Sequence, residues 1–166
     1  MRVLDICSRN VIGCRLNTNL ATVGWMMWES DCGVVPVLDE LGKVIGVITD
    51  RDICMAAATK HRPASEITVQ EVCSGKVYTC RLNDEVRTAL ETMRTNCVRR
   101  LPVVDAEGKI QGLLSLNDVA LAARAETRAR PGEVTYADLA LTLQAVCRHI
   151  ALKKENAAQS RVAAAG

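Results

Sequence analysis

Aromatic side chains are scarce in this sequence. Among its 166 residues there is no phenylalanine, and only two tryptophans and two tyrosines are present. Proteins that bind single-stranded nucleic acid need aromatic rings on which the bases stack. The net charge is only +2, and the lysines and arginines form no basic stripe of the kind that follows a phosphate backbone. Both features argue against nucleic acid as a partner.

Long apolar runs are also missing. A membrane-spanning helix needs about 20 consecutive apolar residues, and the opening segment, MRVLDICSRN, lacks the apolar stretch of a signal peptide. We therefore expect a cytoplasmic protein with no membrane contact. With 49% hydrophobic and 24% charged residues, the chain can bury one ordinary core, or two small ones packed together.

Metal and catalytic motifs are absent as well. The eight cysteines include no CxxC pair, and the only histidines are His61 and His149, so no zinc ligand set is visible. No serine or cysteine forms a recognisable catalytic arrangement with a histidine, and we predict that the protein is not an enzyme. The cysteines suit small buried hydrophobic positions in a reducing compartment. A redox- or metal-responsive role for them remains an alternative.

The chain contains one unit twice, because residues 1–56 align with 67–122 without a gap. The tetrapeptide CRLN at 14–17 recurs at 80–83. Further matches are Cys7 with Cys73, Pro36 with Pro102, Val37 with Val103, Asp39 with Asp105, Gly42 with Gly108, Lys43 with Lys109, Gly46 with Gly112 and Asp52 with Asp118.

Within one unit, the pattern predicts a short helix near residues 4–7, a brief strand at 11–14, and a helix that Asn17 caps and that runs to about Ser30. The second copy of this helix places Val86, Leu90, Met93 and Cys97 on one stripe.

Each unit continues with two apolar strands around a glycine turn. VVPVL and KVIGVIT flank DELG, and RLPVV and KIQGLLS flank DAEG, which predicts two β-hairpins. A helix, DRDICMAAA or LNDVALAAR, follows each hairpin. The order strand, helix, strand, strand, helix indicates a mixed α/β fold.

The junction between each hairpin and its helix carries a repeated polar motif. Thr49 with Asp52, and Ser115 with Asp118, fit the spacing of a capping box, in which a hydroxyl and a carboxylate satisfy amides at a helix start. A capping box normally uses the longer Glu or Gln, and we expect Asp to fall short. The motif also lies at a helix amino terminus, which favours a phosphate. A nucleotide site is therefore the second interpretation.

The tandem repeat, the PV-D-x-x-GK-x-x-G hairpin and the G-x-x-[TS]-x-x-D ending resemble paired cystathionine beta-synthase (CBS) domains, also called a Bateman module. The resemblance covers about residues 1–123. It implies two CBS units with small sheets flanked by helices, related by a pseudo-twofold axis. It also implies a central cleft for adenosine-containing ligands such as AMP, ADP, ATP, NAD or S-adenosylmethionine, with AMP or ATP expected here as a regulatory ligand and no cofactor required.

The resemblance also implies residue roles. The carboxylates of Asp52 and Asp118 would accept the ribose hydroxyls, and Thr49 and Ser115 would contact phosphate. Adenine would lie between a unit's first strand and the strand that contains its proline. The implied base-side residues are Ile12, Gly13, Cys14 and Pro36 in the first copy and Tyr78, Thr79, Cys80 and Pro102 in the second.

The two copies differ at several of these positions. Arg51 stands opposite Asn117, and Arg99 and Arg100 stand opposite Gly33 and Val34. Arg51 or Arg100 could neutralise a phosphate, or each could be a solvated surface charge. Tyr78, which matches Ile12, could stack on a base or be an ordinary half-buried tyrosine.

A further difference concerns assembly. Trp25 and Trp28 match Glu91 and Arg94, which lie off the buried stripe of the second copy. Two tryptophans on such a face would form an exposed apolar patch. We predict that they form the contact of a homodimer, since paired CBS domains resemble one another in dimerising through these helices. The alternative is contact with the chain's own C-terminal helix.

The predicted organisation is a first CBS domain at 1–60, a second at 61–123, a linker at 124–134, an amphipathic helix at 135–153 and a mobile tail at 154–166. Thr135 and Asp138 have capping-box spacing, and the expected apolar face consists of Leu139, Leu143, Cys147 and Ile150. We expect this face to pack either on the module or on the partner subunit. The sequence thus predicts a stand-alone dimeric module that senses an adenine nucleotide and signals to an unidentified protein. A ligand-free dimerisation scaffold, in which both aspartates only cap helices, is a further alternative.

Overall fold

The computed structural model describes residues 1–73 and 75–148. The chain forms two compact units that differ from the sequence repeats. Of the described residues, the first-repeat unit consists of 8–79 and 102–112, and the second-repeat unit consists of 1–7, 80–101 and 113–148. The predicted domain boundaries, 1–60 and 61–123, follow the repeat in the sequence. Each compact unit of the structure instead combines segments from both repeats.

Backbone hydrogen bonds explain the division, because the leading segment of each repeat pairs with the other repeat. The Val3 and Leu4 amides donate to the carbonyls of Asp84 and Leu82, both at 2.9 Å. In the matching arrangement, the Leu20 amide donates to Ile67 O and the Val69 amide to Thr18 O, also at 2.9 Å.

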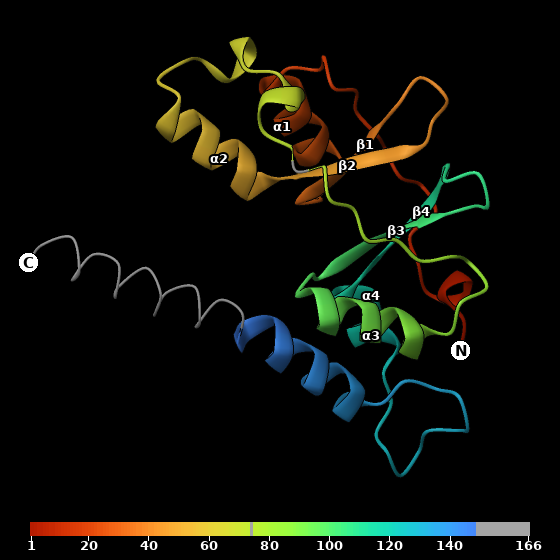
Figure 1. Ribbon diagram of the computed structural model, residues 1–166. Coiled ribbons are helices and arrows are strands. Elements are labelled where there is room, and N and C mark those ends of the chain that lie inside the picture. Colours follow the sequence, from red (N-terminus) through yellow and green to blue (C-terminus); the bar gives the residue numbers. More distant parts are fainter. Residues whose placement is uncertain (74, 149–166) are drawn as a thin grey trace, which may run out of the picture. The chain divides into compact units, whose positions relative to one another are not determined.

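The first-repeat unit contains two helices and one hairpin (Figure 1). Helix α1 (Leu20–Glu29) precedes strands β1 (Val34–Leu38) and β2 (Val44–Thr49), and α2 (Asp50–Thr59) follows directly. The strands are antiparallel, with Val34 opposite Thr49, and Gly42 takes the positive φ of 80° that the turn requires. The core comprises Leu20, Val23, Met27, Val35, Val37, Ile48, Ala56, Ile67 and Val69.

The second-repeat unit contains η1 (Val3–Asp5), α3 (Val86–Asn96) and α4 (Leu116–Ala122). Strands β3 (Arg100–Val104) and β4 (Ile110–Ser115) form the second hairpin and contribute residues to both units. The predicted helical stripe is confirmed for Val86, Leu90 and Met93, which are buried, while Cys97 ends the helix at a φ of 54°. The mixed α/β class and both hairpins are confirmed.

Two local predictions were wrong. Residues 11–14 form no strand; only Cys14 pairs, in an isolated bridge with Val37. Asn19, rather than Asn17, caps α1: its side chain accepts a hydrogen bond from the Thr22 amide at 2.8 Å. The helix cannot begin at Asn17 because the chain still forms a turn there, in which the Thr18 amide donates to Arg15 O. The short helix expected near residues 4–7 is present as a 3₁₀ helix that begins one residue earlier, at Val3.

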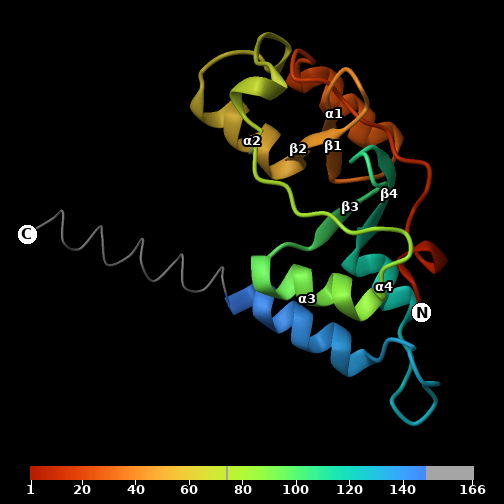
Figure 2. The same ribbon diagram turned by 45° about the vertical axis from the view of Figure 1, so that its right-hand side comes forward.

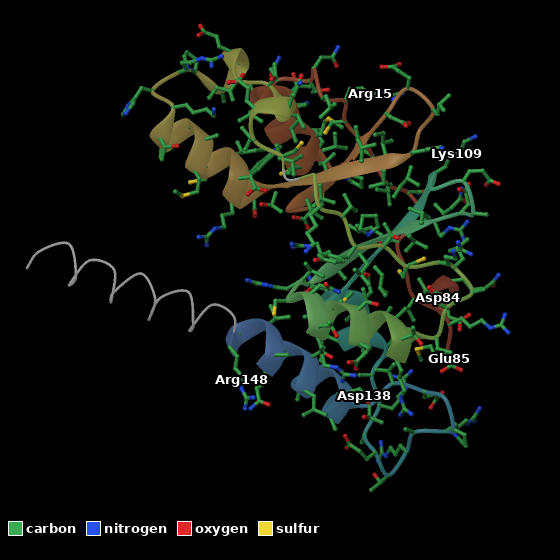
Figure 3. All side chains as sticks on the ribbon, in the orientation of Figure 1. Arg15, Asp84, Glu85, Lys109, Asp138 and Arg148 are labelled. Carbon is green, nitrogen blue, oxygen red and sulfur yellow. The ribbon has the colours of Figure 1, made fainter. Side chains whose placement is uncertain are left out.

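A C-terminal helix over residues 136–148 runs beside α3 (Figure 2). Asp138, labelled in Figure 3, lies near its start and pairs with the Arg87 guanidinium at 3.3 Å. Val134, Thr142 and Val146 are buried there. None of the described helices is long and apolar enough to cross a bilayer.

Leu143 and Cys147, on the predicted apolar face of this helix, are exposed within the single chain, so this face does not pack on the module; packing on a partner subunit stays a prediction. The buried face passes through Thr142 instead, and its hydroxyl is satisfied within the helix by donating to Asp138 O at 2.9 Å. A buried threonine therefore costs little here. Ile150 and the predicted mobile tail lie outside the described residues.

Candidate functional site

The junction of β2 and α2 is closed by a reciprocal cap. The Asp52 amide donates to Thr49 Oγ1 at 3.2 Å, and Asp52 Oδ2 accepts the Thr49 amide at 2.9 Å. The Thr49 hydroxyl also donates to Asp52 Oδ2 at 2.7 Å. Residue 52 lies in the third helical position, so the cap satisfies an amide of the first turn that has no intrahelical acceptor.

The junction of β4 and α4 repeats this geometry. The amide and hydroxyl of Ser115 donate to Asp118 Oδ2 at 2.7 and 2.6 Å, and the Asp118 amide donates to Ser115 Oγ at 3.3 Å. In both copies, the first residue of the helix also bonds to the residue that precedes the hairpin. The Asp50 amide donates to Gly33 O, and the Leu116 amide donates to Arg99 O.

The expectation that aspartate would be too short for a capping box was wrong. A third box, Thr135 with Asp138, closes in the same way at the start of the C-terminal helix. The extended backbone of the N-cap residue brings its amide within reach of the shorter carboxylate. Cap geometry by itself is therefore compatible with a purely structural role.

Two properties distinguish Asp52 and Asp118 from Asp138. Asp138 is neutralised by Arg87, whereas neither Asp52 nor Asp118 has an ion-pair partner within the described chain. The hydrogen bonds that their carboxylates accept from described residues also all use Oδ2. Each partly buried carboxylate thus keeps Oδ1, an acceptor with negative charge, for another group.

The hydroxyls of Thr49 and Ser115 have less freedom. A hydroxyl has one hydrogen to donate, and in both copies that hydrogen is directed at the capping aspartate. Contact with a phosphate oxygen through either hydroxyl would replace this bond. The Arg51 side chain is exposed at the start of α2, and its amide donates to Asp50 Oδ1 at 2.7 Å.

The base-side residues of the first copy come together around β1. The Cys14 amide donates to Pro36 O at 2.9 Å, and Leu38 N–H donates to Cys14 O at 2.8 Å. Gly13 lies beside Leu38 so closely that a Cβ would collide with its Cδ1 and Cγ, which explains a glycine here. Ile12 remains half exposed.

In the second copy, the Lys76 ammonium lies over the ring of Tyr78, 5.3 Å from its centroid. This pairing occupies one face of a ring that was predicted to stack on a base. Thr79 is exposed, Cys80 and Pro102 are buried, and Arg100 is partly exposed in β3.

The predicted site residues are divided between the two units. The first-repeat unit holds residues 12–14, Pro36, Thr49, Arg51, Asp52, Tyr78, Thr79 and Pro102. The second-repeat unit holds Cys80, Arg100, Ser115 and Asp118.

The tryptophans lie on the surface, as the comparison of the two repeats indicated. Trp25 is 64% and Trp28 is 79% exposed. The described part of the C-terminal helix bonds to α3 through Arg87 and Asp138. At the matching positions of α3, Glu91 and Arg94 form an ion pair with each other.

Sequence reasoning missed one cavity, of about 530 Å³, between the C-terminal end of α1 and the start of α2. Its lining includes Gly24, whose counterpart in the second repeat is Leu90. The sequence signal for this cavity is that the first repeat has a glycine where the matching helix of the second repeat has a leucine.

The eight cysteines are thiols rather than disulfides. Burial raises the pKa of Cys14 to about 11 and that of Cys80 to about 12. Cys54 and Cys147 are exposed. Within the described residues, no group of three or more cysteine, histidine or acidic side chains could hold a metal ion.

Comparison with known proteins identifies the family. The CBS domain model matches residues 3–59 and again 69–125, which together make up more than half of the chain. The chain therefore belongs to the CBS domain family and carries a tandem pair of these domains.

Its curated relatives include several proteins without a described function. An uncharacterized 17.7 kDa protein of Acidianus ambivalens is 31% identical over 121 residues, covering 73% of this chain and 72% of that one. The uncharacterized protein MK0525 of Methanopyrus kandleri is 28% identical, over 69% of this chain and 59% of that one. The 5′-AMP-activated protein kinase subunit gamma of Kluyveromyces lactis is 29% identical, with 72% and 39% covered.

Solved structures agree with this assignment. The CBS domain pair of protein MJ0100, in complex with 5′-methylthioadenosine and S-adenosyl-L-methionine, has a TM-score of 0.67 at 25% identity, covering 73% of this chain and 94% of that one. The CBS domain protein TA0289 from Thermoplasma acidophilum has a TM-score of 0.71 at 20% identity, covering 87% and 75%, and supports the fold.

The raised thiol pKa values predict a graded reactivity. The thiolate is the reactive form, so at pH 8 Cys14 and Cys80 should react with iodoacetamide much more slowly than exposed Cys54, and Cys80 roughly tenfold more slowly than Cys14, as measured by peptide mass spectrometry. Raising the pH from 9 toward 11 should destabilise the fold, because the unfolded thiols then ionise while the buried ones do not. Similar rates for Cys14 and Cys54 in native protein, rather than only in denaturant, would contradict this.

Proposed function

We propose that this CBS pair is a regulatory module that binds an adenosine-containing ligand and passes a change of shape to another protein. The observation that carries the proposal is the pair of carboxylates at Asp52 and Asp118. Each is fixed by a helix cap through Oδ2, lacks a cationic partner among the described residues and retains Oδ1 as an acceptor.

A ribose diol suits this arrangement, because its two hydroxyls are donors and a charged acceptor strengthens the bond. The cap fixes the side chain before the ligand arrives, so little rotamer entropy is lost on binding. We therefore assign the ribose to Asp52 and Asp118. The amides of Thr49 and Ser115 hold these carboxylates in place, and their hydroxyls are the proposed phosphate contacts, which would exchange their bond to Oδ2 for one to phosphate. Arg51 and Arg100 are candidate countercharges.

The class of ligand follows from the relatives that have a named ligand. The MJ0100 pair was solved with two adenosine derivatives, one carrying a sulfonium and neither a phosphate, and the kinase subunit of K. lactis bears AMP in its name. Adenosine is the part these molecules share. AMP, ATP and S-adenosylmethionine are the compounds to test on this chain.

For the adenine, we propose the segment around Gly13 and Cys14 next to Pro36, and its counterpart around Tyr78, Thr79 and Cys80 next to Pro102. In the second copy the Lys76 ammonium must leave one face of Tyr78 before a base can stack there.

A ligand-free scaffold is the competing function, and the closed capping boxes favour it. The adenosine-binding account and the scaffold account predict different effects when Asp52 and Asp118 are replaced by asparagine. Asparagine keeps an oxygen that can accept the cap hydrogen bonds but has no charge and presents an amide in place of Oδ1.

We predict that the double variant Asp52→Asn/Asp118→Asn keeps its cap and melts close to the parent, but loses most of the stabilisation by ligand. A ligand at a hundred times its Kd adds about 2.7 kcal/mol to the stability of the parent. Losing a hydrogen bond to a charged acceptor costs about 1.5–3 kcal/mol, or roughly tenfold to a hundredfold in Kd. The measurement is the melting temperature with and without AMP, ATP or S-adenosylmethionine.

Asp138→Asn is the matched control, since it alters a third capping box of the same kind at a place where no ligand is proposed. It should leave the ligand-induced shift in melting temperature unchanged. Asp52→Ala and Asp118→Ala should in addition lose about 1 kcal/mol of stability with the cap. The scaffold account would replace ours if the double asparagine variant gained as much stability from ligand as the parent.

We also propose that two chains associate through the face of α1 that carries Trp25 and Trp28. Their exposure of 64% and 79% leaves a large apolar area in water, which monomers rarely tolerate. The second repeat carries the Glu91–Arg94 ion pair at the same positions and gives no such patch.

Replacing Trp25 and Trp28 with the residues of the second repeat, as Trp25→Glu/Trp28→Arg, should therefore yield folded monomers in multi-angle light scattering. The control, Glu91→Gln/Arg94→Gln, removes the ion pair of α3 and should leave the dimer intact. A tryptophan variant that is still dimeric would show that the contact lies elsewhere.

A further inference from the structure

The exchange of leading segments between the two repeats brings cysteines together in pairs. In the first-repeat unit, Asn19 and Thr68 form an antiparallel bridge. Cys14 lies five residues before Asn19, and Cys73 lies five residues after Thr68. In an antiparallel pairing, equal steps in opposite chain directions lead to residues that face each other. This register therefore places Cys14 opposite Cys73.

The contacts that follow the bridge keep these two cysteines close. The Gln70 amide donates to Leu16 O at 2.9 Å, and the Cys73 amide then turns back to Val69 O at 2.8 Å. Cys14 belongs to the hydrophobic core of this unit, and Cys73 packs against that same core. The two thiols are therefore neighbours within one compact unit.

The second-repeat unit contains the same arrangement. Arg2 and Glu85 form the matching antiparallel bridge. Cys7 lies five residues after Arg2, and Cys80 lies five residues before Glu85. The Cys7 amide turns back to Val3 O at 2.9 Å, as in the first-repeat unit. Because each pair takes one cysteine from each repeat, the duplication has produced two thiol pairs that join the repeats.

The electrostatics of the thiols agree with this pairing. Burial is the main cause of the raised pKa of Cys14, and the neighbouring Cys73 raises this pKa further. Burial, Asp84 and Cys7, in that order, raise the pKa of Cys80. In each unit, the thiol thus responds to the charge of the cysteine that the backbone register places opposite it.

The two pairs differ in how easily a reagent can reach them. Cys7 and Cys80 are both buried, with 9% and 5% of their surface exposed. Cys14 is buried as well, whereas Cys73 is partly exposed. A thiol reacts as an accessible thiolate. Cys73 is therefore the thiol that a reagent meets first, and its pair should react before the pair in the second-repeat unit.

We propose that Cys14 and Cys73 form a reversible disulfide when the protein meets a low-molecular-weight disulfide such as glutathione disulfide. The Cys73 thiolate attacks one sulfur of glutathione disulfide, forms a mixed disulfide and releases one glutathione thiolate. The Cys14 thiolate then attacks the Cys73 sulfur and releases the second glutathione. The two cysteines lose two electrons, their two protons pass through water to the glutathione thiolates, and excess glutathione reverses the reaction.

This disulfide would tie the leading segment of the second repeat to the first repeat. It closes the loop 14–73 and so removes conformational entropy from the unfolded chain. The oxidised protein is therefore more stable than the reduced protein. The proposal does not depend on adenosine binding, and it gives the redox-responsive role of the cysteines a specific site.

Peptide mapping of the native parent protein tests the proposal. The reduced protein is incubated with excess glutathione disulfide, its remaining thiols are blocked with N-ethylmaleimide, and it is digested without reduction for mass spectrometry. Linked peptides that contain Cys14 and Cys73 should form first, and the link between Cys7 and Cys80 at least about tenfold more slowly, because a buried pair reacts only after local opening. Burial raises the pKa of Cys73, so the first link should form about tenfold faster at pH 8 than at pH 7.

Three variants examine the order of the two steps. In Cys14→Ala, Cys73 should stop at the mixed disulfide and retain one glutathione. In Cys73→Ala, Cys14 should stay reduced. The matched control Cys54→Ala removes an exposed thiol outside the pair and should form the link at the rate of the parent. For both the parent and this control, the oxidised form should melt several degrees above the reduced form.

Two results would each overturn the proposal: no link between Cys14 and Cys73 in native protein, or a link that forms only in urea. Should Cys14→Ala or Cys73→Ala fail to fold, the peptide map of the parent still decides, because it requires no variant. The melting-temperature shift of the reduced parent with AMP, ATP or S-adenosylmethionine is a separate measurement, so a failure of the adenosine site is distinguished from a failure of this one.

Discussion

The reciprocal bond between a hydroxyl and a carboxylate at the end of each hairpin is the constraint on which the rest of the site depends. It ends the strand, starts the helix and fixes the aspartate side chain in one step. Because the carboxylate makes its cap bonds through Oδ2 alone, the stability of the helix start and the availability of Oδ1 do not compete. A structural cap and a ligand contact can therefore reside in one residue.

Duplication lets the chain use one set of elements for different purposes. Both repeats keep the cap and the hairpin turn, but the helices before the hairpins have diverged. In the second repeat, α3 carries buried Leu90 and the surface pair Glu91–Arg94, and it packs with the C-terminal helix through Arg87 and Asp138. In the first repeat, α1 has Gly24, Trp25 and Trp28, which leave a cavity and an apolar patch open.

Much of this fold could be predicted because it depends on local rules. The hairpins follow from apolar strands around Gly42 and Gly108, and the stripe of α3 follows from helical spacing. The predictions failed where a single interaction decides which of two similar residues takes a given structural position. Asn19 caps α1 in place of Asn17, because the chain is still turning at Thr18. The composition of the units depends on long-range backbone pairing at Val3 and Val69, which no local pattern reveals.

The central claim is that the two capped aspartates make this CBS pair a receptor for an adenosine-containing molecule. Native mass spectrometry of the purified protein with AMP, ATP or S-adenosylmethionine tests this most directly. The account predicts that at least one of these ligands adds its mass to the parent protein, and that the adduct is lost when Asp52 and Asp118 are both replaced by asparagine. An unliganded parent at saturating concentrations of all three, or an adduct that persists in the asparagine variant, would contradict it.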